Sequence, residues 1–86
     1  MIARHNVADK LNDYLHHRLD LDDIVSWAES AMMDVDFDPS DFDNIRDIVA
    51  RIGLADVRAF GLTWEDCENF LNRLGYRVHL DVSPTR

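Results

Sequence analysis

Two adjacent histidines, His16 and His17, are the residues whose type and spacing first suggest chemistry. Asp13 and Asp20 stand three or four positions away, a spacing that brings side chains together on one face of a helix. Such a group can bind zinc or manganese. Neighbouring helical residues, however, project about 100 degrees apart, so both histidines do not readily bind one ion. Surface histidines are the favoured interpretation, and a metal site formed by Asp13, His16 or His17 with another chain is the alternative.

A second run of ligand-type residues, 34–45, begins like the calcium-binding loop of an EF-hand, with oxygen-bearing side chains at its first, third, fifth and seventh positions. Its later positions do not fit this loop. Pro39 occupies the sixth position, which needs glycine, and Ile45 occupies the twelfth, which needs a bidentate glutamate. We therefore assign neither a metal nor a cofactor to the chain.

Cys67 is the single cysteine and the only candidate thiol nucleophile. The carboxylates of Asp66 and Glu68 beside it disfavour a thiolate, and its spacing places it on the apolar stripe of a predicted helix, so we expect it in the core. The sequence contains no G-x-S-x-G turn and no phosphate-binding loop, since its three glycines are isolated. We predict no catalytic residue and expect the chain not to be an enzyme.

Apolar periodicity predicts helices throughout the first half of the chain. The first covers residues 2–19, and the second covers 21–33 after an N-cap at Asp20. A third helix is expected to begin with Asp38 as its cap and Pro39 at its first position. These segments place apolar side chains on one face and acids on the other.

The second half continues the pattern with glycines as helix terminators. Gly53 is expected to end the third helix in a left-handed cap. A short helix or turn over 54–60 is closed by Gly61, and a fourth helix begins with a capping box at Thr63–Asp66 and ends at Gly75. The sequence thus predicts about four helices plus a short connecting helix.

The fold class expected is therefore mainly α, a small helical bundle in which residues 1–86 form one domain, because 86 residues are too few for two. Phe42 is expected to point inward with the third helix. The predicted core consists of Leu11, Leu15, Ile24, Trp27, Ala28, Ile45, Ile48, Val49, Ile52, Phe60, Trp64, Leu71 and Leu74.

After the fourth helix the apolar period changes from 3.6 to 2, which predicts a C-terminal strand over residues 76–82. A lone strand cannot pair its own backbone donors and acceptors. Two interpretations stay open: the segment lies extended over the helices, or it pairs with another chain. The second implies a homo-oligomer joined through Tyr76, Val78, Leu80 and Val82.

The charge is strongly unbalanced, with 17 acidic against 9 basic residues and a net charge of -8. An acidic surface repels phosphate backbones and anionic lipids, so neither nucleic acid nor a membrane is an expected partner. One cysteine allows no internal disulfide, and no apolar segment is long enough for a signal peptide or a membrane span. The cytoplasm is the expected compartment.

All of this imbalance lies in the first half, because residues 1–45 carry a net charge of -8 and residues 46–86 carry none. Between positions 20 and 43 the chain has nine acids and no base. Capping explains part of them; the alternatives for the rest are a solvated acidic rim and a surface that attracts a basic partner. The acids expected to bind a partner are Glu29, Asp34, Asp36, Asp38, Asp41 and Asp43.

Residues 7–15 and 21–28, with Trp27 and Ala28 among them, resemble the first two helices of small bacterial helical proteins of colicin-type immunity character. Such immunity proteins are acidic helical bundles that bind and neutralise a basic nuclease toxin. The terminal strand departs from that pattern, and the resemblance assigns no binding residue. It implies a non-enzymatic interaction protein, immunity-like or antitoxin-like, that binds a basic protein.

Overall fold

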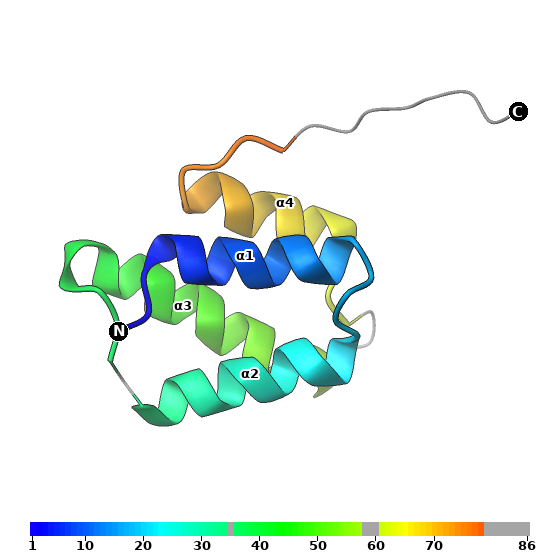
Figure 1. The fold of residues 1–86 in the computed structure, drawn as a ribbon, viewed down its shortest axis with the longest axis horizontal. Helices are drawn as coiled ribbons and strands as arrows, with labels where there is room; N and C mark the ends of the chain where they lie inside the picture. Colours follow the sequence, from blue (N-terminus) through cyan, green and yellow to red (C-terminus); the bar gives the residue numbers. More distant parts are fainter. Residues whose placement is uncertain (35, 58–60, 79–86) are drawn as a thin grey trace, which may run out of the picture.

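The computed structural model describes residues 1–34, 36–57 and 61–78, and within these ranges the chain forms a compact arrangement of four α-helices and two short 3₁₀ helices. In chain order they are α1 (Arg4–Leu15), α2 (Leu21–Asp34), η1 (Pro39–Asp41), α3 (Phe42–Gly53), η2 (Ala55–Val57) and α4 (Trp64–Arg73). Figure 1 shows α2 and α3 packed as an antiparallel pair, with α1 crossing above them and α4 against α1. The mainly helical prediction is confirmed.

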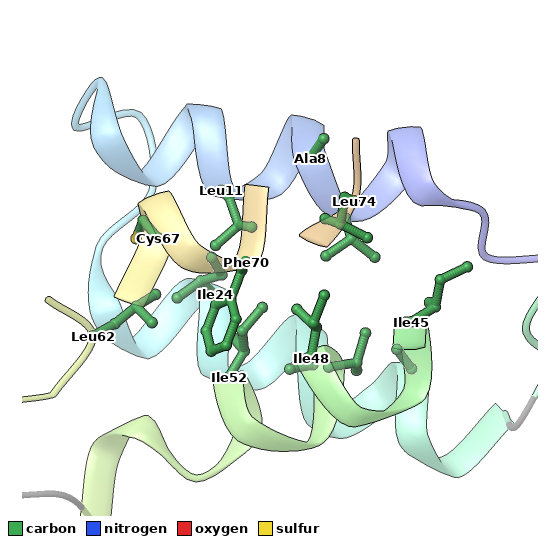
Figure 2. Packing of buried hydrophobic residues seen from close by; sticks show 14 of the residues in the cluster. Ala8, Leu11, Ile24, Ile45, Ile48, Ile52, Leu62, Cys67, Phe70 and Leu74 are labelled. Carbon is green, nitrogen blue, oxygen red and sulfur yellow. The ribbon is translucent and has the colours of Figure 1, made fainter. Parts of the chain in front are cut away.

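Each helix contributes apolar side chains to one core (Figure 2). Leu11 of α1, Ile24 of α2 and Ile48 of α3 are fully buried, and Cys67 of α4 and Leu74 just after it meet them. Full burial of a leucine or isoleucine side chain stabilises a fold by about 1.5–3 kcal/mol. Nine of the predicted core positions are buried: Leu11, Ile24, Ala28, Ile45, Ile48, Val49, Ile52, Leu71 and Leu74.

Some of the predicted core positions lie further out than expected. Leu15 and Trp27 are only half-buried, and Phe60 lies outside the described residues. The prediction for Trp64 was wrong, because 42% of this residue is exposed. Trp64 is the first residue of α4, where a side chain leans toward the helix N-terminus, and it lies at the surface near Leu15 of α1 instead of in the core.

The first helix is shorter at both ends than the predicted 2–19. At its C-terminus the amide of Arg18 donates to the carbonyl of Asp13 at 2.8 Å, and that of His17 donates to Tyr14 at 3.1 Å. These two bonds form a Schellman motif, which requires a left-handed residue at its centre. His17 occupies that position with φ of 61°, a conformation that glycine usually supplies.

At its other end, the segment before α1 forms an isolated parallel β-bridge between Ile2 and Phe37. The amide of Ile2 donates to the carbonyl of Asp36 at 2.7 Å, and the amide of Asp38 donates to the carbonyl of Ile2 at 2.8 Å. Phe37 is buried against the core. The connection between α2 and α3 is thus tied to the start of the chain, which the helical pattern at Ile2 did not predict.

Aspartates begin the middle helices. Asp20 accepts from the amide of Asp23 at 2.8 Å, and the Asp23 carboxylate accepts from the amide of Asp20 at 3.2 Å, which confirms the predicted N-cap. Asp38 also caps, accepting from the amide of Ser40 at 3.0 Å, but the turn that it caps is η1. The third helix itself begins only at Phe42.

Gly53 does not adopt the left-handed cap conformation that its position suggested, and it is the last residue of α3. Leu54 follows it with φ of -100°, and its amide bonds back to the carbonyl of Arg51 at 3.2 Å. The chain passes directly from α3 into the 3₁₀ helix η2, so no reversal at Gly53 is needed.

The start and end of α4 are as predicted. Thr63 Oγ1 accepts from the amide of Asp66 at 3.0 Å, and the Asp66 carboxylate accepts from the amide of Thr63 at 3.1 Å. Gly75 has φ of 92° and Gly61 has φ of 64°, so both take the left-handed conformation expected of terminators. The residue types of the sequence therefore predicted the N-cap and the end of α4 correctly.

The predicted C-terminal strand is not seen where the structure can test it. Residues 76–78 form no strand, although Val78 packs against the core. The remainder of the predicted strand, including Leu80 and Val82, lies outside the described residues.

Candidate protein-binding surface

Four of the six acids expected to bind a partner lie close together in the chain, on the segment that joins α2 to α3 and on the first turn of α3. They are Asp36, Asp38, Asp41 and Asp43, and we call this region the acidic end. It lies beside the N-terminal residues, at the left of Figure 1. The β-bridge from Ile2 to Phe37 holds the backbone of this segment against the bundle.

Two of these carboxylates also accept hydrogen bonds from neighbouring residues. Asp38 accepts from the amide of Ser40, and this bond, together with the charge of Arg4, holds the pKa of Asp38 below its usual value. Asp41 accepts from the side-chain amide of Asn44 at 3.1 Å. Both side chains therefore help to fix the conformation of the acidic end.

Asp36 and Asp43 are exposed side chains of the acidic end. A carboxylate oxygen of Asp36 lies 3.4 Å from the amino group of Met1, and Asp43 lies in the first turn of α3, where the helix dipole favours negative charge. An exposed pair of this kind contributes little to stability. These two carboxylates are accessible to a partner.

Glu29 does not join the acidic end. The Cγ atom of Glu29 lies 3.9 Å from the position a Cβ would take on Gly53, at the far end of α3. Asp43 is in the first turn of that helix, ten residues away, which corresponds to about 15 Å along the helix axis. Asp34 is the last residue of α2, and its side chain lies outside what the structure describes.

Exposed apolar side chains accompany these acids. Met33, near the end of α2, is 83% exposed, and Phe42 is 38% exposed although an inward position was predicted for it. The ring of Phe42 instead packs edge-to-face against the buried ring of Phe37, with 5.8 Å between centroids. Phe37 takes the inward position, a role that the alternation of apolar and acidic residues over 35–38 could have indicated.

Among the described residues, the arginines that form ion pairs do so with Asp13 and Asp47, outside the acidic end. Arg18 pairs with Asp13 at 3.0 Å, while Arg51 and Arg73 both contact one carboxylate oxygen of Asp47, at 3.1 and 3.0 Å. Within the described ranges, no lysine or arginine forms an ion pair with a carboxylate of the acidic end. Apart from the exposed Met1–Asp36 pair and the charge of Arg4 near Asp38, the negative charge of the described acidic end faces solvent.

The residues considered for a metal site are not brought together. Asp13 bonds to Arg18, Nδ1 of His16 lies 2.8 Å from the carbonyl of Asn12, and His17 lies beyond the end of α1. Across the described portions of the chain, no three His, Cys, Asp or Glu side chains are grouped so that they could hold a metal ion. His16 and His17 are both exposed, as the favoured interpretation expected.

Cys67 lies in the core, as predicted, and is completely buried. Burial, assisted by the negative charge of Asp66, raises the pKa of the Cys67 thiol to about 12. The thiol is therefore protonated and shielded from solvent near neutral pH, and both burial and the Asp66 carboxylate disfavour the thiolate that nucleophilic chemistry needs.

Comparisons of the chain with protein-family models, with curated proteins and with solved structures found no match. A search of the described residues for a helix with the length and apolarity to cross a membrane also found none.

Proposed function

We propose that this chain is a non-enzymatic interaction protein whose acidic end binds a basic protein partner. The observation that carries the proposal is the pairing of exposed charge with exposed apolar surface at one end of the bundle. Asp36 and Asp43 supply charge that no described lysine or arginine pairs with, and Phe42 supplies exposed apolar area next to Asp43 at the start of α3. Met33 adds an exposed apolar side chain near the end of α2, the helix that leads into this segment.

The carboxylates and the exposed apolar side chains have separate roles in such binding. Carboxylates steer a basic protein toward the surface and exclude acidic competitors. Exposed methionine and aromatic side chains give the apolar area that stabilises the complex once it has formed, since such residues are enriched at protein interfaces. The backbone of the acidic end is already held by the Ile2–Phe37 bridge and the Asp38 cap, so little ordering is required on binding.

The kind of partner follows from the charge and from the resemblance to colicin-type immunity proteins. We propose an immunity-like or antitoxin-like role in the cytoplasm, in which the acidic end occupies a basic surface of the partner. A partner that also extends along α2 would bind Glu29 and Asp34 in addition to the acidic end.

Site-specific photo-crosslinking tests the location of the surface. A photo-reactive residue at position 33 is compared with the same residue at position 68, because Met33 and Glu68 are both exposed but lie on α2 and α4. We expect position 33 to capture a basic protein from the native host, with capture reduced by raised salt and by Asp36→Asn/Asp43→Asn.

Two results would contradict the proposal. One is equal capture from both positions, which indicates non-specific contact. The other is a crosslinked partner whose capture at position 33 is unchanged by raised salt and by neutralising Asp36 and Asp43, because screening and charge removal weaken an electrostatically driven complex.

A further inference from the structure

A groove of about 540 Å³ runs between α1 and α4, and no carboxylate of the acidic end lines it. One wall is α1, and the opposite wall combines α4 with residues 76–78, which follow that helix. Leu15 and Leu71 give the groove apolar lining, and Asp9 and Arg77 give it charge. Its volume lies within the range of about 300–1,000 Å³ that small-molecule sites occupy. We call this the α1–α4 groove.

The two ends of the groove differ in their chemistry. Leu15 and the exposed ring of Trp64 lie at one end, since both also line the hollow beside the connection between α1 and α2. At the other end, a Cβ on Gly75 would lie 3.4 Å from Nη1 of Arg4, so the chain that follows α4 begins beside the first turn of α1. Asp9 precedes Leu15 by six residues, which is about 9 Å along the axis of α1. The groove is therefore charged toward one end and apolar toward the other.

The two charged side chains face the groove without neutralising each other. Asp9 and Arg77 are both exposed and line opposite walls. Within the described ranges, neither forms an ion pair with the other or with a third residue. Unpaired opposite charges that share one groove are complementary to a ligand that carries a cation and an anion close together.

We propose that the α1–α4 groove binds a free α-amino acid with a large apolar side chain. The ammonium and carboxylate groups of such a molecule are attached to one carbon atom, so Asp9 and Arg77 bind them at the same end of the groove. A guanidinium binds a carboxylate through two parallel hydrogen bonds, which orients the ligand. Its side chain then lies toward Leu15 and Trp64, where an aromatic ring gains from contact with the indole.

Other classes of small molecule fit these charges less well. A simple anion bound to Arg77 lies beside the Asp9 carboxylate, and a simple amine bound to Asp9 lies beside the Arg77 guanidinium, so each meets a like charge. An uncharged apolar molecule makes no use of either group. An α-amino acid pairs with both groups and has no net charge, so the chain's own charge of -8 does not repel it.

The test is an NMR titration of the full-length ¹⁵N-labelled protein with L-phenylalanine, followed at the indole N–H of Trp64. Two further probes each lack one charged group: L-phenylalaninamide has no carboxylate, and 3-phenylpropionate has no ammonium. Asp9→Asn and Arg77→Gln remove the two charges from the protein. Asp22→Asn and Arg46→Gln are the matched controls, because these side chains are exposed on α2 and α3.

We expect L-phenylalanine to shift the Trp64 indole signal saturably, with a Kd of about 1 mM, and to leave the indole signal of Trp27 on α2 unchanged. Both truncated probes should bind the wild type about tenfold more weakly, and Asp9→Asn and Arg77→Gln should bind L-phenylalanine about tenfold more weakly, because each loses a charge-assisted hydrogen bond.

Three results would overturn the proposal. The first is a titration in which L-phenylalanine leaves the Trp64 signal in place. The second is equal affinity for L-phenylalanine and either truncated probe, since both charges are then not recognised. The third is equal weakening by the groove variants and by Asp22→Asn and Arg46→Gln, which indicates a response to overall charge only.

Discussion

Asn44 of α3 and Arg73 of α4 hydrogen-bond to each other in both directions. Nε of Arg73 donates to Oδ1 of Asn44 at 3.0 Å, and Nδ2 of Asn44 donates to the backbone carbonyl of Arg73 at 2.8 Å. That carbonyl belongs to the last turn of α4, where no further helical amide is available to pair with it. A side chain of one helix thus caps another and fixes the end of α4 against α3.

Replacing this link gives the first prediction. Asn44→Ala removes both hydrogen bonds to Arg73, together with the bond from Asn44 to Asp41, and leaves the Arg73 carbonyl to solvent, so we expect the free energy of unfolding to fall by about 1 kcal/mol. Urea denaturation measures the change. Asn69→Ala on the exposed face of α4 has the same effect on helix propensity and should be neutral or slightly stabilising; an equal loss in both variants would show that the Asn44 link contributes nothing.

The second prediction concerns the two Schellman motifs at the ends of α1 and α4. Substitutions at their left-handed residues should change the free energy of unfolding in opposite directions. The motifs share the same pair of backbone bonds, but the left-handed residue is His17 in one and Gly75 in the other. His17→Gly should raise the free energy of unfolding by about 0.5–1 kcal/mol, and Gly75→Ala should lower it by about 1 kcal/mol. Thermal and urea denaturation check both; destabilisation by His17→Gly would mean that the imidazole makes a contact more important than backbone strain.

The third prediction concerns Gly53. Whether an alanine at this position stabilises or destabilises the protein depends on the backbone conformation of Gly53. A methyl group at Gly53 would meet Ala28 and Glu29 at 3.8 to 4.0 Å, which is ordinary van der Waals contact. Since Gly53 is helical, Gly53→Ala should raise the free energy of unfolding by about 0.5–1 kcal/mol. A left-handed Gly53, as the sequence suggested, would instead give a loss of stability in the same denaturation experiment.

Asp47 gives a pH-dependent prediction. Its hydrogen bond from Arg73, reinforced by Arg51, lowers the pKa of Asp47 from 3.8. A carboxyl whose pKa is lowered by folding contributes stability above its unfolded pKa, and that stability is lost as the pH falls through the folded value. Thermal melts between pH 6 and pH 2, measured at a series of pH values, should therefore show a weaker acid dependence for Asp47→Asn than for the wild type.

The exposed carboxylate of Glu68, on α4, is the control for that experiment. Glu68→Gln should leave the acid dependence close to that of the wild type, because isolated surface charges contribute little to stability. If Asp47→Asn and Glu68→Gln behave alike, the contacts of Arg51 and Arg73 with Asp47 do not contribute to stability.

Local patterns predicted the helices well. The apolar spacing located all four, and the caps at Asp20 and Thr63 and the terminator Gly75 lie where their residue types indicated. These features depend on interactions within a few residues along the chain, so sequence is sufficient to predict them. The end of α1 is the exception, because His17 takes a conformation for which glycine is the usual signal.

Long-range relationships were not predictable in the same way. The Ile2–Phe37 bridge joins residues 35 positions apart, and the Asn44–Arg73 link joins residues 29 positions apart, and neither has a periodic signature. For the same reason the six acids proposed from composition are divided by the fold. The antiparallel pairing of α2 and α3 sets Glu29 beside Gly53, away from Asp43.

The central claim is that the acidic end binds a basic protein, and the affinity of the captured partner tests it most directly. Calorimetric titration gives Kd for the wild type, for Asp36→Asn/Asp43→Asn and for the control Glu65→Gln/Glu68→Gln, which removes the same charge from α4. We predict that the acidic-end variant binds about tenfold more weakly, as expected for losing two exposed charge pairs, and that the control binds like the wild type. Equal weakening by both variants, or none by either, would contradict the claim.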